Sequence, residues 1–183
     1  RAFPPAAGVS LLVRDWLANG LEDASFDAAI SIEAISHMPD KPRAFAEIAR
    51  VLRPGGRIAI VDWLHREEPS PREVRWLLRP ICEEGRLPSL HAASEYVAFL
   101  REAGLEPLGH ENLSDRAART WALVARRLPG VLLRDPALTA RLLRSPDRTF
   151  ALSLARIPLA YRLGTMRLGL FRARKPADSA NGV

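Results

Sequence analysis

The sequence predicts an α/β fold built on an open, mostly parallel sheet, and three observations lead to this class. Two short apolar runs, 26–32 and 57–63, have the composition of strands buried on both faces. Between them, the periodic apolar residues of 40–52 indicate one helix, so the three segments form a strand–helix–strand unit with parallel strands. The 183 residues, 48% of them hydrophobic and 26% charged, suffice for one globular domain.

The first part of the chain supplies this unit. Residues 8–14 (GVSLLVR) are a short, mostly apolar run that predicts a strand, and the turn-rich segment 19–25 predicts a surface loop. Asp40 is expected to cap a helix that holds Pro42 in its first turn. The buried stripe of this helix is expected to be Phe45, Ile48, Ala49 and Leu52, with Pro54-Gly55-Gly56 as its end.

Beyond Trp63 the pattern becomes helical. The sequence Ser70-Pro71-Arg72-Glu73 is a capping box, which predicts a helix with Val74, Leu77, Leu78 and Ile81 on its buried side. Another helix is expected over 89–103, with Gly104 as its stop, and a strand over 105–110.

The last third is expected to be helical until its final strand. The predicted helices are 115–127, 136–144 and 148–161, followed by a strand over 165–174. Residues 175–183 are expected to form a flexible, frayed tail.

The composition limits the partners and the compartment. Residues 1–114 carry 13 Lys and Arg against 17 Asp and Glu (net −4), and residues 115–183 carry 14 against 4 (net +10), which together give +6. The basic third has no interleaved aromatic residues and no nucleic-acid motif, so we expect no nucleic-acid partner. Cys82 is the only cysteine, which excludes an internal disulfide and a cysteine cluster for a metal. We expect no transmembrane span, no secretory signal and a reducing, cytoplasmic setting.

Five motifs between Asp15 and Trp63 occur in a recognisable order. They are Asp15-Trp16, DASFD at 23–27, HMPD at 37–40, RVLRPGG at 50–56 and IVDW at 60–63. In this order they resemble the second half of a class I methyltransferase dependent on S-adenosyl-L-methionine (SAM). The similarity is to the branch that methylates sugars, sterols, tocopherols and related lipidic quinols. It continues more weakly over 96–108 and 161–176.

The resemblance implies a Rossmann-like sheet with an antiparallel last strand. It also implies a single domain over 1–183, with a helical insertion over 64–90 that covers the substrate. The family's glycine-rich loop, and the acidic residue that holds the ribose hydroxyls, have no match here and would precede Arg1. At about 30 residues per βα unit, we expect the N-terminal βα units, roughly 60 residues or more, to be missing from the domain.

The resemblance also implies contacts with SAM. Asp15 would accept a hydrogen bond from the adenine amino group, and Trp16 would pack on the ring. Ser31 and Glu33 would face the methionine end, at the carboxyl end of their strand. Structural alternatives are a turn cap for Asp15, a core position for Trp16 or Ser31, and a first-turn helix position for Glu33.

His37 and Asp62 are the candidate catalytic residues. Methyl transfer to a hydroxyl requires a base for the proton, and an imidazole, with an ordinary pKa of about 6.5, can accept a proton at neutral pH. Asp62 ends the neighbouring parallel strand and is expected to orient or charge-stabilise the imidazole, the helper role that the resemblance assigns to it. The alternative is that His37 caps a helix and Asp62 closes a strand.

The sequence therefore predicts an enzyme that transfers a methyl group from SAM to a small natural-product, sugar or lipidic acceptor. A hydroxyl acceptor is favoured, with C- and N-methylation left open. The alternative is a truncated, non-catalytic module that binds partners or anionic surfaces through its basic third. Peripheral membrane contact would use an apolar stripe beside the arginines, made of Phe150, Leu154, Ile157 and Tyr161. No metal site is expected, and the oligomeric state is not indicated.

Overall fold

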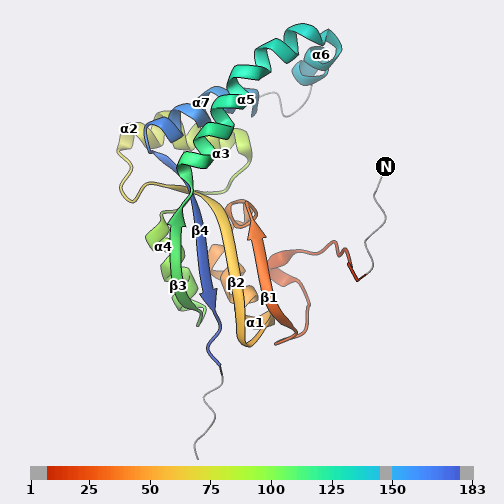
Figure 1. The fold of residues 1–183 in the computed structure, drawn as a ribbon, viewed down its shortest axis with the longest axis vertical. Coiled ribbons are helices and arrows are strands. Elements are labelled where there is room, and N and C mark those ends of the chain that lie inside the picture. The colour runs from red at the N-terminus through yellow and green to blue at the C-terminus, as the bar shows by residue number, and fades with distance from the viewer. Residues whose placement is uncertain (1–7, 145–149, 178–183) are drawn as a thin grey trace, which may run out of the picture.

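The computed structural model describes residues 8–144 and 150–177, which fold around a four-stranded open sheet (Figure 1). The strands are β1 (Phe26–Ile32), β2 (Leu52–His65), β3 (Glu106–Asn112) and β4 (Met166–Arg174), in the spatial order β1-β2-β4-β3. β1 and β2 are parallel, whereas β4 is antiparallel to both β2 and β3. This arrangement confirms the predicted Rossmann-like α/β class and its antiparallel last strand.

The helices form two groups. α1 (Lys41–Val51) and α4 (Ala93–Glu102) pack on one face of the sheet, while a second group gathers beyond the end of β1 and β2 (Figure 1). We call this second group the helical layer: α2 (Pro71–Glu73), the π-helix η3 (Val74–Leu78), α3 (Arg79–Gly85), α5 (Ser114–Arg134) and α7 (Phe150–Arg162). α6 (Pro136–Arg144) follows α5, and two short 3-10 helices are η1 (Trp16–Ala18) and η2 (Ile35–His37).

The main core lies between the sheet and the pair α1 and α4. Its members are fully or almost fully buried: Ile35, Phe45, Ile48, Ala49, Leu52, Ile58, Ile60, Leu64, Tyr96, Leu100, Leu105, Phe171 and Ala173. The predicted stripe of α1 thus faces the core, because i, i+3, i+4 and i+7 share one side of a helix. A second core joins the helical layer to the sheet through Leu77, Ile81, Ile157, Ala160, Tyr161 and Met166.

Local signals set the helix ends. The Asp40 side chain accepts a hydrogen bond from the backbone N–H of Arg43 at 2.9 Å, which confirms the predicted cap of α1. At α2, Ser70 and Glu73 exchange the two hydrogen bonds of the predicted capping box. Gly104 follows α4 with a φ of +75°, a conformation that favours glycine.

Two predictions for the strands are wrong. Residues 8–14 form no strand, and Leu11 and Val13 are 80% and 105% exposed. An apolar run becomes a strand only when another strand completes its backbone hydrogen bonds, and the described residues offer this segment none. β1 is also not buried on both faces, because it lies at the edge of the described sheet and leaves Ile30 78% exposed.

The predicted flexible tail is wrong at its first residue. Lys175 donates hydrogen bonds from Nζ to the carbonyl oxygens of Ala49 and Leu52, both at 2.8 Å, and so fixes the chain after β4 to the end of α1. Residues 178–183, the rest of the predicted tail, lie outside the described residues, as do residues 148 and 149 of the predicted helix 148–161. Within the described ranges, every helix is too short or too polar to cross a bilayer.

We expect Gly56→Ala to lower the free energy of unfolding by about 2 kcal/mol. A Cβ at Gly56 would lie 2.8 Å from the carbonyl oxygen of Arg53 and 3.2 Å from that of Asp27, and backbone atoms cannot move aside as a side chain can. Urea unfolding measures the change. Gly130→Ala is the control: it meets nothing within 4 Å in α5, so it should stabilise the chain by about 0.5–1 kcal/mol. Equal effects of the two variants would contradict the packing at Gly56.

Candidate active site

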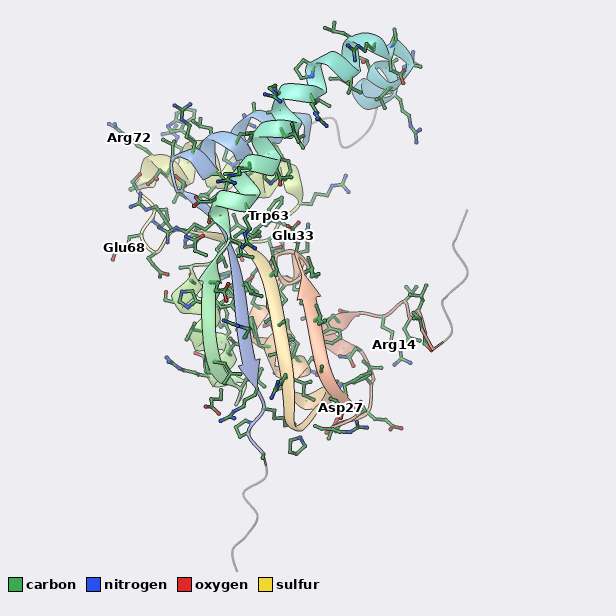
Figure 2. The ribbon with its side chains drawn as sticks, in the orientation of Figure 1. Arg14, Asp27, Glu33, Trp63, Glu68 and Arg72 are labelled. Carbon is green, nitrogen blue, oxygen red and sulfur yellow. The ribbon has the colours of Figure 1, made fainter. Side chains whose placement is uncertain are left out.

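The parallel pairing of β1 and β2 brings their carboxyl ends together. Ile32 pairs with Val61, and the backbone N–H of Glu33 donates to the carbonyl oxygen of Val61 at 2.7 Å. We call this end of the sheet the carboxyl edge; it faces the helical layer, and Glu33 and Trp63 lie where the two meet (Figure 2). In open α/β sheets, ligands bind at this edge.

The turn after β1 carries His37 and is held by Asp62. We call residues 34–38, which include η2, the His37 turn. The Asp62 carboxylate is 0% exposed, and its Oδ2 accepts a hydrogen bond from the backbone N–H of Ser36 at 2.7 Å. Its Oδ1 accepts from the backbone N–H of Trp63 at 2.9 Å. Asp62 therefore fixes the residue next to His37, while the His37 side chain itself is exposed.

The predicted pairing of His37 with Asp62 takes an indirect form. Although both side chains lie in the described part of the chain, no hydrogen bond joins the Asp62 carboxylate to the imidazole. The Asp62 carboxylate accepts three hydrogen bonds from other groups, and its connection to His37 runs through the backbone of Ser36. This geometry fits a positioning residue for the His37 turn.

Tyr96 of α4 is the third donor to Asp62. Its hydroxyl donates to Oδ2 at 2.9 Å, and its ring stacks on Phe171 and meets Phe45 edge to face. Burial, and then the Asp62 charge, raise the pKa of Tyr96, so the hydroxyl remains a donor. The charge of Asp62 is thus compensated by hydrogen bonds from η2, β2 and α4.

Lys41 holds the other side of the His37 turn. It is only 2% exposed, and its Nζ donates to the carbonyl oxygen of Met38 and to Oγ of Ser89, both at 3.2 Å. Burial lowers the pKa of Lys41, and the nearby charge of Asp62 opposes this shift. Because Met38 directly follows His37, the turn is fixed at Ser36 by Asp62 and at Met38 by Lys41.

The hydrogen bonds continue from Lys41 to the base of the helical segment 64–90. Oγ of Ser89 lies 3.1 Å from Nε2 of His91, and Nδ1 of His91 lies 2.8 Å from Oε1 of Glu95. The backbone N–H of His65 donates to the carbonyl oxygen of His91 at 3.0 Å, so the segment begins and ends at one place. A chain of polar groups therefore links this segment to the His37 turn.

The predicted cofactor residues do not all come together. A cavity of about 220 Å³ lies beside the end of β1 and is lined by Trp16, Ala29, Ile30, Ser31, Ile32, Ala34, Ile35, Met38, Ile48 and Ile58. Trp16 and Ser31 thus share one site. Asp15 is exposed beside it and caps η1 by accepting from the backbone N–H of Leu17 at 3.0 Å. Glu33 is exposed outside the lining, with a φ of +49°.

The size and chemistry of this cavity limit what it can hold. At about 220 Å³ it is smaller than the roughly 300–1,000 Å³ of whole small-molecule sites, so it fits only part of SAM. Its apolar lining and the Trp16 ring suit a flat heteroaromatic base. Across the described ranges, no three His, Cys, Asp or Glu side chains are grouped to hold a metal ion.

Sequence reasoning missed Lys41, Ser89 and Tyr96, which support the His37 turn. One signal could have pointed to Lys41. The chain has 27 Lys and Arg, of which only Lys41 and Lys175 are lysines, and both bind backbone carbonyl oxygens. A rare lysine in an arginine-rich chain marks a place where a compact ammonium is needed.

Known methyltransferases are similar to this chain in sequence. A "Methyltransferase domain" family model matches residues 2–60. The 27-O-demethylrifamycin SV methyltransferase of Amycolatopsis mediterranei is 36% identical, the alignment covering 84% of this chain and 54% of that protein. The chloroplastic tocopherol O-methyltransferase of Arabidopsis thaliana is 33% identical, covering 91% and 49%.

A solved structure extends the comparison to the fold. A Galdieria sulphuraria protein described as a sarcosine dimethylglycine methyltransferase superimposes with a TM-score of 0.71 at 25% identity, covering 88% of this chain and 57% of that one. The chain therefore shares the fold of that protein over most of its length. In sequence and in fold the chain is similar to class I SAM-dependent methyltransferases. It spans about half the length of the curated relatives it matches.

The buried Lys41 predicts a pH-dependent stability. Folding lowers the pKa of Lys41. At pH values between the folded-state pKa and the ordinary value of 10.5, Lys41 is therefore protonated to a greater extent in the unfolded chain than in the folded chain. In that window the unfolding free energy of the wild-type chain should rise with pH relative to Lys41→Met, as urea unfolding can measure. Lys175→Met, which also removes an ammonium bonded to two carbonyl oxygens, is the matched control. A wild-type advantage that stays flat or falls as pH rises would contradict the shift.

Proposed function

We propose that this chain provides the acceptor side of an enzyme that transfers a methyl group from SAM to a hydroxyl of a small molecule. The observation that carries the proposal is the His37 turn, fixed at the carboxyl edge by Asp62 and Lys41 beside the cavity of Trp16 and Ser31. The named methyltransferase relatives support the same reaction class. The cytoplasmic setting is part of this proposal.

His37 is proposed as the general base. SAM would supply the methyl group of its sulfonium and leave as neutral S-adenosylhomocysteine, whose sulfur keeps the electron pair of the broken S–C bond. The imidazole accepts the proton of the acceptor hydroxyl as the oxygen attacks the methyl carbon, so the proton ends on a ring nitrogen. Such proton transfer contributes about 10²–10⁴-fold to a rate when the base is held in place. The exposed His37 side chain is free to meet an acceptor that enters from the helical layer.

Asp62 is proposed to act through the backbone. Its bond to the N–H of Ser36 keeps the imidazole within reach of the acceptor, and Lys41 does the same through the carbonyl of Met38. Reacting groups must lie about 3–3.5 Å apart, so a loosened turn would slow the reaction. These residues are therefore positioning residues.

For the cofactor, Trp16 is proposed to pack on the adenine ring of SAM, and Ser31, which lines the same cavity, is proposed to face the methionine end. Asp15, exposed beside the cavity, is proposed to accept from the adenine amino group with the oxygen that does not cap Leu17. Glu33 is proposed to face the methionine end, as its place directly after β1 suggests. The segment 64–90 is proposed as the cover of the acceptor site.

A second candidate function, contact with an anionic membrane, has support in the helical layer. Arg119 of α5 and Arg162 of α7 flank a groove of about 550 Å³, and neither has a carboxylate partner among the described residues. Leu159 in this groove is 46% exposed. Cationic side chains around exposed aliphatic carbon suit the interface of an anionic bilayer.

The apolar stripe predicted for this membrane contact is wrong. Ile157 is 0% exposed and Tyr161 is 6% exposed, so they face the second core. The side chains of Phe150 and Leu154 lie outside the described residues. A helix that packs on the core with one face presents the other face to solvent, which here carries Leu159 and Arg162.

His37→Ala should lower kcat for methyl transfer by at least about 100-fold and leave the affinity for S-adenosylhomocysteine unchanged, because the imidazole serves the acceptor. Titration calorimetry of S-adenosylhomocysteine and radiolabelled methyl transfer measure the two quantities, in this chain and in an N-terminally extended one. His110→Ala, an exposed histidine on β3, is the control. Undiminished turnover in His37→Ala would exclude His37 as the general base. Absence of cofactor binding in both chains would overturn the methyltransferase proposal.

The double variant Arg119→Gln/Arg162→Gln should bind phosphatidylglycerol-containing vesicles about 30-fold more weakly than the wild-type chain, since each arginine near an anionic surface contributes about fivefold. Vesicle sedimentation measures the loss. Arg57→Gln/Arg101→Gln removes the same charge from exposed positions on β2 and α4. If that control variant loses as much affinity for the vesicles, net charge alone explains the binding, and the groove is excluded as the membrane-binding site.

A further inference from the structure

The two tyrosines of the chain occupy opposite hydrogen-bonding situations. Tyr96 donates its buried hydroxyl to Asp62 at 2.9 Å. Tyr161 is 6% exposed, and its buried hydroxyl has no hydrogen-bond partner among the described residues. A buried hydroxyl without a partner costs roughly 1–3 kcal/mol, so such groups are rare in a folded chain.

Tyr161 lies where the helical layer meets the carboxyl edge. It is in the last turn of α7, and its carbonyl oxygen accepts from the N–H of Gly164, which turns the chain into β4. β4 begins at Met166, which pairs with His65 at the end of β2. The phenol therefore belongs to the layer next to the edge that carries the His37 turn.

The surroundings of Tyr161 are apolar and reach this edge. The buried members of its cluster are Leu77, Ile81, Ile157, Ala160 and Met166, with Trp63 and Trp121 partly buried against them. Trp63 directly follows Asp62 on β2, and its ring meets that of Trp121 at a centroid distance of 5.9 Å. A molecule that reached the Tyr161 hydroxyl would thus be held largely by hydrocarbon and aromatic surface.

The charges nearby define what the hydroxyl can bind. Burial, and then the carboxylate of Glu33, raise the pKa of Tyr161, so the phenol stays protonated and acts as a donor. Glu33 follows β1 at the carboxyl edge (Figure 2). A ligand oxygen that carried a negative charge would be repelled by Glu33, whereas a neutral hydroxyl, ether or carbonyl oxygen would not.

We propose that the Tyr161 hydroxyl binds the acceptor substrate by donating a hydrogen bond to an oxygen of a neutral, largely apolar molecule. This inference rests on the proposed methyl transfer and adds the residue that anchors the acceptor. The bound oxygen satisfies the hydroxyl that the folded chain leaves unpaired.

The matched variants Tyr161→Phe and Tyr96→Phe separate binding from folding. Tyr161→Phe removes an unpaired hydroxyl, so its thermal midpoint should rise by about 3 °C, whereas Tyr96→Phe leaves Asp62 with one donor fewer and should melt lower. The affinity of Tyr161→Phe for 2,3,5-trimethylhydroquinone should fall about tenfold, with unchanged affinity for S-adenosylhomocysteine.

Carbon-13 labelling of the tyrosine Cζ atoms gives a direct readout, because the chain yields only two such resonances and the variants assign them. Trimethylhydroquinone, added with and without S-adenosylhomocysteine, should shift the Tyr161 resonance and leave that of Tyr96 in place. The anionic analogue 4-hydroxybenzoate should bind more weakly than the quinol, because Glu33 repels its carboxylate.

Four results would overturn the inference. They are a Tyr161 resonance that the quinol does not move, one that S-adenosylhomocysteine alone moves, equal affinity for the anionic analogue, and a Tyr161→Phe chain that melts below the wild type. The last would mean that the hydroxyl is satisfied within the folded chain. Failure of the proposed methyl transfer has a separate signature, the absence of S-adenosylhomocysteine binding, and the quinol titration without cofactor still decides the role of Tyr161.

Discussion

The buried carboxylate of Asp62 is the constraint on which the candidate site depends. A charge in an apolar interior costs several kcal/mol unless hydrogen bonds replace its water. Here the replacements are the backbone N–H groups of Ser36 and Trp63 and the hydroxyl of Tyr96. These donors belong to η2, β2 and α4, so the three elements must stay together to keep the carboxylate hydrogen-bonded. The geometry of the carboxyl edge is thereby fixed.

Lys41 supplies the positive charge that balances this arrangement. Its ammonium interacts electrostatically with both Asp62 and Glu95, yet its direct hydrogen bonds go to the carbonyl of Met38 and the hydroxyl of Ser89. A cation shared in this way attracts two carboxylates without being tied to either. The His37 turn and the base of the segment 64–90 thereby belong to one electrostatic network.

Features that depend on residues close together in the sequence could be predicted, whereas the hydrogen bonds between residues far apart in the sequence were missed. The cap at Asp40 and the capping box at Ser70 join residues three apart, so both could be read from the chain. The bonds to Asp62 join residues 26 and 34 apart, which no local pattern indicates. The strand predicted over 8–14 failed for the same reason, since strand formation depends on a partner. Trp16 and Ser31 were found by resemblance, because a shared cavity is visible only in three dimensions.

The return of segment 64–90 to its own starting point has an evolutionary consequence. Its two ends are joined by the parallel bridge of Leu64 with His91 and by the hydrogen bond from His65 to His91, so the chain leaves the sheet and returns to it at one place. Insertions in the exposed parts of the segment are therefore compatible with an unchanged register of β1 and β2, whereas changes at Leu77 or Ile81 would disturb the second core. If the segment covers the acceptor site as proposed, such insertions would change the cover and leave the strands beneath it in place.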